Sequence, residues 1–391
     1  MKERSEGWIF GLTLASATTV LLSIRVSQSL LALACLVWIV FRPKPVRLPP
    51  YSLALIGFMA ATLLSLGMSM DPGVGAPAIR KFVLFSMGIL AANFVTTPKR
   101  AKLSYGLLII VAAISATLAT VQFGLGYREY LSTGALADDP TVLARASGFM
   151  GHWMTYSGEQ LLIWCGALPA LAIMGHRWIF PLSIVGIGIV SSFTRSVWIG
   201  AIVGISTIAL TIPRNILIKL IIPVVLVILA SAPLIYHRLA MSVEEGFGPD
   251  VGRLALIETG IQMVRDHPLF GVGPQRIATE FVGYYDEENL DTFYYGHMHN
   301  NLLQIAAERG LICLIAFVWF FVELFKGLLR LKGTRDPTLR FMALSALAAL
   351  TGFLVAGLFE YNFGDSEVLM LFLFIVSIPF GLAARRRAEG N

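Results

Sequence analysis

Long apolar runs constrain this chain more than any other feature. Each run is about 17–25 residues long, enough for a helix to cross the hydrocarbon core of a bilayer. Hydrophobic residues make up 56% of the 391 residues and charged residues only 14%, where a soluble domain carries about a quarter charged residues. One soluble core could not bury this much apolar surface, so lipid must be the solvent for much of it. The sequence therefore predicts an all-α polytopic integral membrane protein with about 12 transmembrane helices.

The apolar runs divide the chain into spans and two long connections. The predicted spans are 8–24, 26–41, 51–70, 79–97, 103–122, 158–175, 178–194, 196–212, 215–236, 301–329, 340–359 and 367–384. The two spans that meet at Arg195 are joined by a very tight connection, or they are one hydrophobic stretch with a break. The organisation is 1–236 with nine spans, a periplasmic loop at 237–299, and 300–391 with three spans and a basic tail.

Charge predicts the orientation of the spans. With the N-terminus inside, the inner segments hold nineteen of the 30 basic residues and five of the 24 acidic ones. The inner side then carries +14 and the outer side −8, as the positive-inside rule expects of cytoplasmic and periplasmic loops. Both termini are predicted to be cytoplasmic. The long connections 123–157 and 237–299 then lie outside, where loops of this length are usually functional.

Several other functions are excluded by the same residues. The net charge of +6 is explained by topology, so it is no argument for a nucleic-acid partner. The three cysteines form no pair with ligand spacing, which argues against a disulfide framework or a zinc site. The glycines at 271 and 273 hint at a dinucleotide motif, but position 276 is arginine and the segment is predicted to lie outside.

The loop 237–299 is predicted to contain short amphipathic helices. Leu254, Ile257, Ile261 and Val264 recur at helical spacing, which predicts a helix over 253–266. Pro268 ends this helix, because the residue before a proline avoids the helical region. Such a helix would lie on the membrane surface or roof the bundle.

The strongest local signal is GHMHNNLLQIAAERG at 296–310. Two histidines, His297 and His299, lie where the loop re-enters the membrane, and Asn300, Gln304 and Glu308 then recur on one helix face. Polar groups at the head of a span are costly unless they face a cavity or partners, so this stripe is a candidate site. A histidine here could serve as a general base. No third metal ligand stands out beside the two histidines, and we predict no metal and no cofactor.

Several arginines on the outer side indicate an anionic ligand. Arg195 lies between hydrophobic runs without an acidic neighbour in sequence, and its planar guanidinium suits phosphate oxygens. The further candidates for binding a lipid diphosphate are Arg80, Arg253, Arg265 and Arg276. The alternative for each arginine is interfacial anchoring or a salt bridge.

Two more polar clusters are predicted on the outer side. The segment 145–160 brings Arg145 and His152 just before a span, as possible acceptor-binding or supporting residues. The segment FEYNFGDSE at 359–367 places Glu360, Asn362 and Asp365 at the outer end of the last hairpin.

The pattern resembles the O-antigen ligase and polymerase superfamily of bacterial envelope glycan transferases, over the whole chain. The resemblance rests on TRSVWIG (194–200), GRLALIETGIQMVRDHPLFGVGPQR (252–276) and HMHNNLLQIAAERG (297–310). The ligases carry a histidine followed by Asn, Ser or Gln, then nine residues and a glycine, which His299, Asn300 and Gly310 match. The ligase pattern tends to continue with Gly, Thr or Tyr three positions later, where this chain has Cys313.

The resemblance implies a glycosyltransferase that moves a glycan from undecaprenyl diphosphate to an acceptor hydroxyl in the periplasm, without a metal and with inversion. For a ligase the acceptor is a lipid A-core sugar. By position, His299 would be the catalytic base, and Arg195 and Arg253 would clamp the diphosphate. The alternatives are an O-antigen polymerase with a lipid-linked glycan as acceptor, a protein O-oligosaccharyltransferase, and a transporter or lipid flippase. No inverted repeat supports the transporter.

Overall fold

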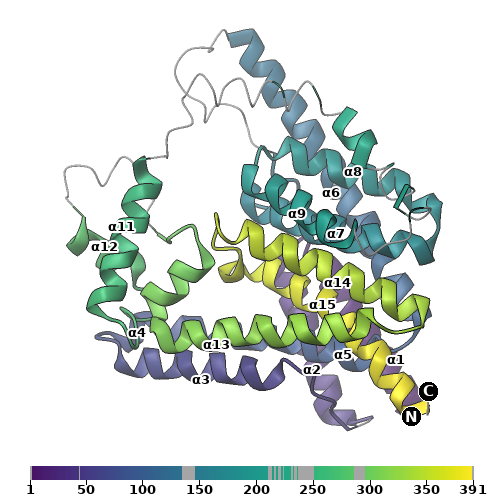
Figure 1. Cartoon of the computed structure of the whole chain (residues 1–391), viewed down its shortest axis with the longest axis horizontal. Coiled ribbons are helices and arrows are strands. Elements are labelled where there is room, and N and C mark those ends of the chain that lie inside the picture. The colour runs from purple at the N-terminus through teal and green to yellow at the C-terminus, as the bar shows by residue number, and fades with distance from the viewer. Residues whose placement is uncertain are drawn as a thin grey trace.

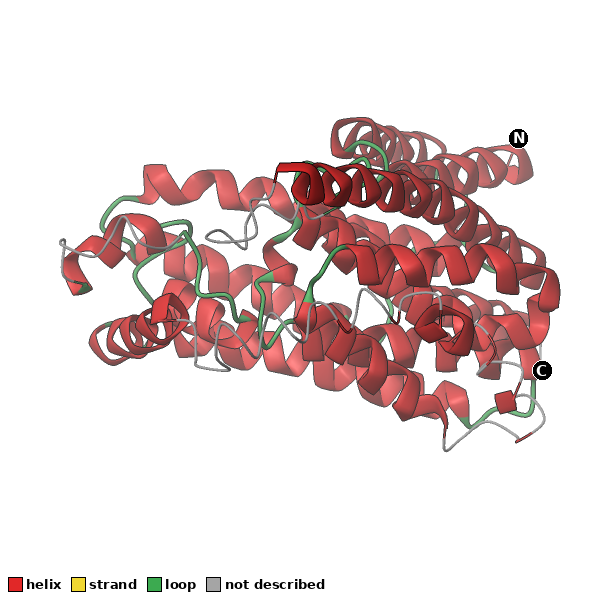
Figure 2. Cartoon of the chain, turned by 90° about the horizontal axis from the view of Figure 1, so that it is seen from above, coloured by secondary structure: helices red, strands yellow, loops and turns green. Residues whose placement is uncertain are grey.

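The protein is a bundle of helices in the computed structural model (Figures 1 and 2). The structure describes residues 2–43, 45–133, 146–209, 251–285 and 296–389, with isolated positions between 214 and 236. These residues contain no strand. The helices are α1 (Lys2–Thr19), α2 (Ile24–Phe41), α3 (Ser52–Met68), α4 (Pro72–Gly75), η1 (Ala76–Phe85), α5 (Ser86–Phe94), α6 (Pro98–Thr133), α7 (Trp153–Met174), η3 (His176–Trp178), α8 (Ile179–Ser191), α9 (Arg195–Ala209), α11 (Val251–Asp266), α12 (Ile277–Tyr284), α13 (Asn301–Lys332), α14 (Pro337–Ala356), η5 (Asn362–Gly364) and α15 (Ser366–Glu389).

The predicted class, an all-α polytopic membrane protein, is confirmed. A helix lies at every predicted span except 215–236, half of which falls outside the described residues. Seven helices in the described part are long and apolar enough to cross a membrane. Three shorter apolar helices, Ser52–Met68, His176–Ser191 and Arg195–Ala209, accompany them. The count of twelve spans and the periplasmic position of 237–299 stay predictions.

The connection at Arg195 is a tight turn between two helices. Helix α8 ends at Ser191 and α9 begins at Arg195, while Phe193 between them has a positive φ of 52°. Of the two alternatives that the sequence left open, the structure therefore has the tight connection.

Small residues allow the central helices to pack closely. A Cβ atom added to Gly200 of α9 would lie 2.7 Å from the Gly352 carbonyl oxygen of α14. One added to Gly204 would lie 2.8 Å from the Ala348 carbonyl oxygen. Close backbone approach through small residues is how helices associate where lipid removes the hydrophobic driving force. Glycine thus sets the distance between α9 and α14.

Both chain ends lie at one end of the bundle, and α11 and α12 lie at the opposite end (Figure 1). Helix α11 ends at Asp266, the last residue of the predicted helix, and begins two residues before the predicted start. Its buried face, which includes Leu256 and Met263, packs in a small hydrophobic cluster with Met298 and Ala307. The predicted amphipathic helix is therefore anchored on the start of α13.

Helix α13 is broken at Gly310. This glycine has φ 82° and ψ 171°, outside the helical region, and a Cβ there would lie 2.1 Å from the Leu269 carbonyl oxygen. The segment 268–276 fills the break: the Val272 N–H donates to the Ala307 carbonyl at 3.0 Å. The Leu311 N–H in turn donates to the Pro268 carbonyl at 2.8 Å. The sequence predicted one continuous span over 301–329, and the break was not foreseen.

Candidate functional site

A cavity of about 700 Å³ lies at the start of α13. Its walls come from η1, from the start of α7, from the segments before α12 and α13, and from the turn between α14 and α15. The lining residues are Lys81, His152, Trp153, Met154, Thr155, Gln275, Gly296, His297, His299, Gln304, Glu308, Glu360, Tyr361, Asn362, Gly364 and Asp365. Polar and aromatic side chains far apart in sequence thus share one hollow.

His299 is paired with Glu360 in this cavity. The His299 Nδ1 atom lies 3.1 Å from Glu360 Oε2, and both side chains are mostly buried. His299 has a positive φ of 46°, which turns the chain sharply before α13 begins. A histidine whose Nδ1 bonds a carboxylate has its tautomer and ring orientation fixed. The pair is therefore arranged so that Nε2 is the basic nitrogen.

Asn300 and Asn301 hydrogen bond the segment that carries His299 to the turn that carries Glu360. Asn300 caps α13 by accepting the Leu303 N–H at 2.9 Å, and its amide donates to the Leu358 carbonyl at 2.9 Å. Asn301 donates to Asn362 Oδ1 at 2.6 Å. The turn that carries Glu360 is thus bonded to the first residues of the helix that follows His299. An Asn at the N-cap position is favoured because its oxygen satisfies an otherwise unpaired amide.

The electrostatics keep Glu360 ionised and His297 neutral. Burial acts to raise the pKa of Glu360, but the hydrogen bond from His299 and the neighbouring imidazoles outweigh it and lower the pKa. Burial, with the nearby charge of His299, lowers the pKa of His297 to about 4. The His297 Nδ1 atom accepts the His299 N–H at 3.3 Å, and its Nε2 lies 3.6 Å from Glu360 Oε1. At neutral pH this contact therefore joins a neutral imidazole to a carboxylate.

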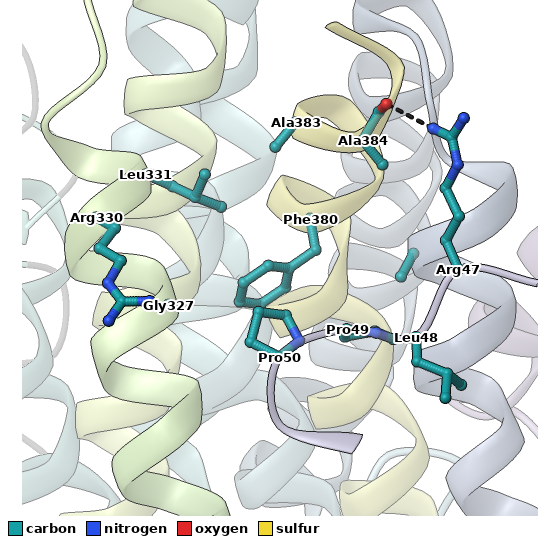
Figure 3. Close-up of a pocket in the computed structure, with 11 residues that line it drawn as sticks. Arg47, Leu48, Pro49, Pro50, Gly327, Arg330, Leu331, Phe380, Ala383 and Ala384 are labelled. Atoms are coloured by element: carbon teal, nitrogen blue, oxygen red, sulfur yellow. Dashed lines mark hydrogen bonds between the residues drawn. The ribbon is translucent and has the colours of Figure 1, made fainter. Parts of the chain in front are cut away.

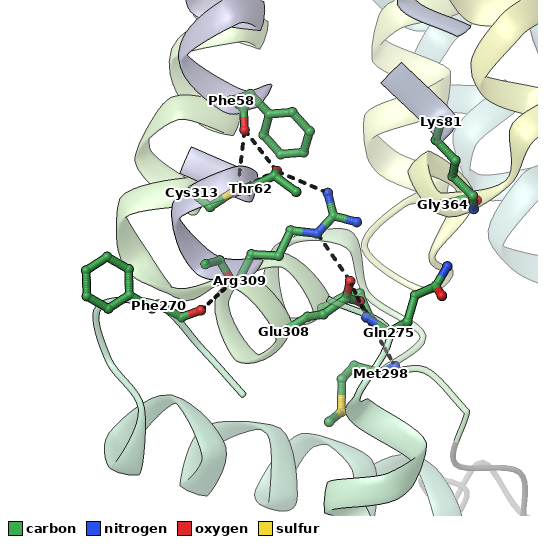
Figure 4. Close-up of polar contacts among 12 residues, drawn as sticks. Phe58, Thr62, Lys81, Phe270, Gln275, Met298, Glu308, Arg309, Cys313 and Gly364 are labelled. Atoms are coloured by element: carbon green, nitrogen blue, oxygen red, sulfur yellow. Dashed lines mark hydrogen bonds and ion pairs between the residues drawn. The ribbon is translucent and has the colours of Figure 1, made fainter. Parts of the chain in front are cut away.

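A buried polar ladder around Glu308 reaches Met298, the residue between the two histidines (Figure 4). Gln304 accepts the Met298 N–H at 2.8 Å and donates to Glu308. Glu308 also accepts the Gln275 N–H at 3.1 Å and the Arg309 Nε–H at 3.2 Å. Buried carboxylates need such partners, because removing a charge from water is costly. The ladder thus links the loop that carries His299 to the segment 268–276.

The opposite wall of the cavity carries Lys81 and Asp365. Lys81 donates to the Gly364 carbonyl, and Thr155 donates to Asp365 at 2.6 Å. Burial, with the nearby carboxyl of Glu367, raises the pKa of Asp365 above its usual range. Lys81 is the one lysine or arginine among the lining residues, all of which are described. A phosphate in this cavity would therefore meet Lys81.

The structure brings together some of the predicted site residues and separates others. His152, His297, His299, Gln304 and Glu308 line the cavity, and Asn300 caps the adjoining helix. The five predicted arginines are not among the lining residues. Arg80, Arg195 and Arg265 are exposed, Arg253 is partly buried, and Arg276 is buried and paired with Glu280. Arg145 lies outside the described residues.

Sequence reasoning did not assign roles to Glu360 or Lys81. The segment 359–367, which includes Glu360, is predicted at the same end of the bundle as His299, and the two do meet, but nothing in the sequence paired Glu360 with a histidine 61 positions away. The sequence analysis predicted Arg80 as a donor contact, but the cavity is lined by the next residue, Lys81. The signal that could have found Glu360 is its place, with Asp365, in the short polar segment between the last two apolar runs.

The cavity also holds a group with metal-ligating atoms. One ligand atom each from His297, His299 and Glu360 lie within 4.8 Å of one another. Glu360 thus supplies the third potential ligand atom, which the sequence did not reveal. In the structure His299 Nδ1 hydrogen bonds to Glu360 and His297 Nε2 lies 3.6 Å from Glu360 Oε1, an arrangement that also orients an imidazole for catalysis.

The described residues thus form a bundle of apolar helices with a histidine oriented by a carboxylate in a cavity at one end. Residues 180–318 match the family described as O-Antigen ligase, a range that includes α8, α9, α11, α12 and His299. The chain is also 27% identical over 194 residues to the exopolysaccharide production protein ExoQ of Rhizobium meliloti (strain 1021).

The ExoQ match covers 44% of this chain and 44% of ExoQ, so less than half of that relative's length is spanned. Both matches support the O-antigen ligase-like superfamily, and the resemblance drawn from the motifs is borne out. They support a function of the membrane glycan ligase or polymerase type. The family and the apolar helices together suggest a multi-pass inner membrane protein.

Proposed function

We propose that this protein transfers a glycan from undecaprenyl diphosphate to a hydroxyl of a lipid A-core sugar, on the periplasmic side of the membrane. The observation that carries the proposal is the His299–Glu360 pair, with Nδ1 and Oε2 3.1 Å apart in the cavity at the start of α13. A glycosyl acceptor hydroxyl needs a base, and a histidine held by a carboxylate supplies one near neutral pH.

The chemistry needs few groups because diphosphate is already a good leaving group. His299 Nε2 takes the proton of the acceptor hydroxyl as its oxygen forms a bond to the anomeric carbon. The bond from that carbon to the diphosphate oxygen breaks, and its electron pair stays on the diphosphate. Attack from the opposite face inverts the anomeric centre. Glu360 stabilises the imidazolium that forms on His299.

The developing charge on the diphosphate requires cations. Lys81 is the proposed contact that the lining of the cavity supports. Arg195 and Arg253, with Arg80, Arg265 and Arg276, remain proposed donor contacts that rest on the family resemblance. A cation directed at the leaving group stabilises the transition state more than the ground state, which is what accelerates the reaction.

A polymerase is the second candidate, with a second lipid-linked glycan as the acceptor. The observation that favours it is the similarity to a protein whose name is exopolysaccharide production protein. The same base and donor site would serve both reactions, since only the acceptor differs. Purified protein with undecaprenyl-diphosphate glycan, offered either lipid A core or more donor, separates the two candidates by product.

Replacement of the base tests the mechanism in either case. His299→Ala should lower turnover about 10²- to 10⁴-fold, the range that general-base catalysis supplies, while donor binding is retained. The control is His267→Ala, because His267 is an exposed histidine that does not line the cavity. Unchanged turnover in His299→Ala would remove His299 from this role. The assay is run with and without EDTA, since a loss of turnover in EDTA would instead make the His297, His299 and Glu360 group a metal centre.

A further inference from the structure

Helix α11 leaves a row of aliphatic side chains exposed. Leu254, Ile257 and Ile261 recur at helical spacing and are each 42–44% exposed. The row continues at Leu269, which follows the helix and is 56% exposed. These residues are called the apolar row below. Neighbouring apolar side chains left exposed in this way mark a surface that contacts lipid or protein.

The apolar row occupies one edge of the exposed face of α11, and polar residues occupy the other edge. Glu258 and Gln262 are both exposed, and each follows a residue of the row by one position, so its side chain points about 100° further around the helix. On the side of the row, a Cβ added to Gly260 would lie 2.9 Å from the Leu303 side chain of α13. Ile257 and Gly260 are three positions apart and are therefore neighbours on the helix surface. The apolar edge is thus the edge nearer to α13.

The depth of α11 follows from its connection to α3. No charged residue lies between Arg47 and Asp71 in the sequence, and α3 (Ser52–Met68) fills most of this stretch. Arg47 lines a second cavity, of about 410 Å³, beside the last turns of α13 (Figure 3). Near the other end of α3, about two turns before Asp71, the Ser65 hydroxyl donates to the Phe270 carbonyl at 2.6 Å. Charged residues flank a span at the membrane boundaries, so the segment that follows α11 lies close to the boundary marked by Asp71.

The apolar row is continuous with the exposed surface of α13. The Leu311 N–H donates to the Pro268 carbonyl at 2.8 Å, which places Leu269 beside the turn of α13 that follows the break at Gly310. Leu311 and Ile315 are themselves exposed on α13, a helix long and apolar enough to cross a membrane. Exposed aliphatic side chains on such a helix face lipid. The row therefore extends the lipid-facing surface of α13 onto α11.

We propose that α11 is an interfacial helix, with the apolar row inserted among the acyl chains at the membrane surface and with Glu258 and Gln262 in water. Amphipathic helices bind membranes in this way, by burying one face at the boundary between head groups and acyl chains. The row is too small to bind a second protein, because its partly exposed side chains fall far short of the about 800 Å² per partner that a specific interface buries. Of the two positions predicted from the sequence, the membrane surface is therefore favoured over the roof of the bundle.

The buried face of α11 connects this membrane contact to the candidate site. That face packs in one cluster with Met298, which lies between His297 and His299. An α11 held in the membrane surface therefore also holds this wall of the first cavity close to the lipid head groups. None of these contacts depends on the glycan transfer proposed above.

Spin labels on the full-length protein test this orientation in phosphatidylglycerol nanodiscs. Four single-cysteine variants are made in a Cys35→Ala background, in which the remaining Cys165 and Cys313 are 0% exposed and should not react. The variants are Ile257→Cys, Glu258→Cys, Ile261→Cys and Gln262→Cys. Collisions of each label are measured with oxygen, which concentrates among acyl chains, and with a nickel chelate, which stays in water. The oxygen-to-nickel ratio should be several-fold higher at 257 and 261 than at 258 and 262.

Ile315→Cys is the lipid reference, because Ile315 is 69% exposed on α13. Its ratio should match the ratios at 257 and 261. Equally low ratios at all four positions would put the row in water and overturn the proposal. Exclusion of both reagents from 257 and 261 would also overturn it, since a protein would then cover the row. Equally high ratios at all four positions would overturn it by showing a helix submerged in lipid on both edges.

Aspartate substitutions give a second measurement that needs no label. A carboxylate is costly among acyl chains and is well solvated in water, so Ile261→Asp should lower Tm in the nanodiscs more than Gln262→Asp does. Ile261→Ala measures the loss of packing alone, and Ile261→Asp should lower Tm further than this variant. Equal Tm values for Ile261→Asp and Ile261→Ala would contradict insertion of the row.

Discussion

Helix α13 begins at one cavity and ends at the other, and its two parts differ in almost every respect. Before Gly310 it buries Gln304, Glu308 and Arg309, all hydrogen bonded to one another or to the segment 268–276. After Gly310 it buries aromatic rings such as Phe317 and Phe320, and it ends near an arginine without a carboxylate partner in the described structure. The first part of α13 therefore contains a hydrogen-bonded network of polar side chains. The second part is mainly apolar and carries Arg330, which has no carboxylate partner among the described residues.

The difference shows how each end handles charge. At the start of α13 every buried charge is balanced locally, so side chains are held in fixed orientations, as a catalytic base requires. Near the end of α13 Lys326 pairs with Glu323 at 3.2 Å on the exposed surface, whereas Arg330 has no carboxylate partner among the described residues. If the hydrogen-bonded network at the start of α13 controls glycan transfer, substitutions within it should lower turnover and matched substitutions outside it should not.

The largest effect is expected from Glu360→Gln. The amide keeps the shape of the side chain but cannot stabilise an imidazolium or fix the tautomer of His299, so kcat should fall about 10²- to 10⁴-fold. The control is Glu258→Gln, because Glu258 is an exposed carboxylate of α11. Wild-type turnover in Glu360→Gln would show that Glu360 does not assist His299 in catalysis.

The next largest effect is expected from Gly310→Ala, which should lower the free energy of unfolding. The added Cβ would lie 2.1 Å from the Leu269 carbonyl oxygen, in a backbone conformation that alanine avoids. The destabilisation should be about 3 kcal/mol or more, the range of strained and overpacked positions. It is measured by thermal unfolding in detergent. Gly283→Ala is the control, since nothing lies within 4 Å of a Cβ there, and a Tm for Gly310→Ala equal to that control would contradict the role of the break.

The smallest effect concerns pH, through His297. Its pKa falls from 6.5 in the unfolded chain to about 4 in the fold, because of burial and the neighbouring His299. The unfolded state thus takes up the proton first, and stability present above pH 6.5 is lost as the pH falls towards 4. The loss should be about 2–3 kcal/mol.

His297→Gln removes this titration, so its unfolding free energy should fall less than that of the wild type between pH 6.5 and 4. His267→Gln, at an exposed histidine, should keep the wild-type dependence. Parallel pH profiles for the wild type and His297→Gln would show that His297 is not held neutral by the fold. Activity at neutral pH is a separate readout, because His297 also lines the cavity.

Local patterns were sufficient to predict much of the fold. Apolar length located the helices, and helical spacing with Pro268 located α11 to within two residues, because both signals act over a few neighbouring residues. The spacing of Gln304 and Glu308 placed them on one face, and the two side chains do hydrogen bond. These are the features that the chain determines without long-range contacts.

The site was predicted less completely because its pairs are distant in sequence. His299 meets Glu360 only through the hairpin of α14 and α15, and the break at Gly310 depends on the Leu269 carbonyl 41 residues earlier. The arginines led to the prediction of an anionic ligand, which stays a prediction, but composition does not say which side chain reaches a cavity. Lys81, beside the predicted Arg80, is the residue that does so.

The break at Gly310 bears on how the protein is inserted during synthesis. The Ala307 and Glu308 carbonyls have no helical partner there, and unsatisfied backbone groups are not tolerated in lipid. Their donors, Val272 and Gly273, leave the ribosome before α13 does. The segment 268–276 is therefore synthesised before the part of α13 that it completes. Moving that segment to a later position in the chain would deprive the nascent helix of its partner.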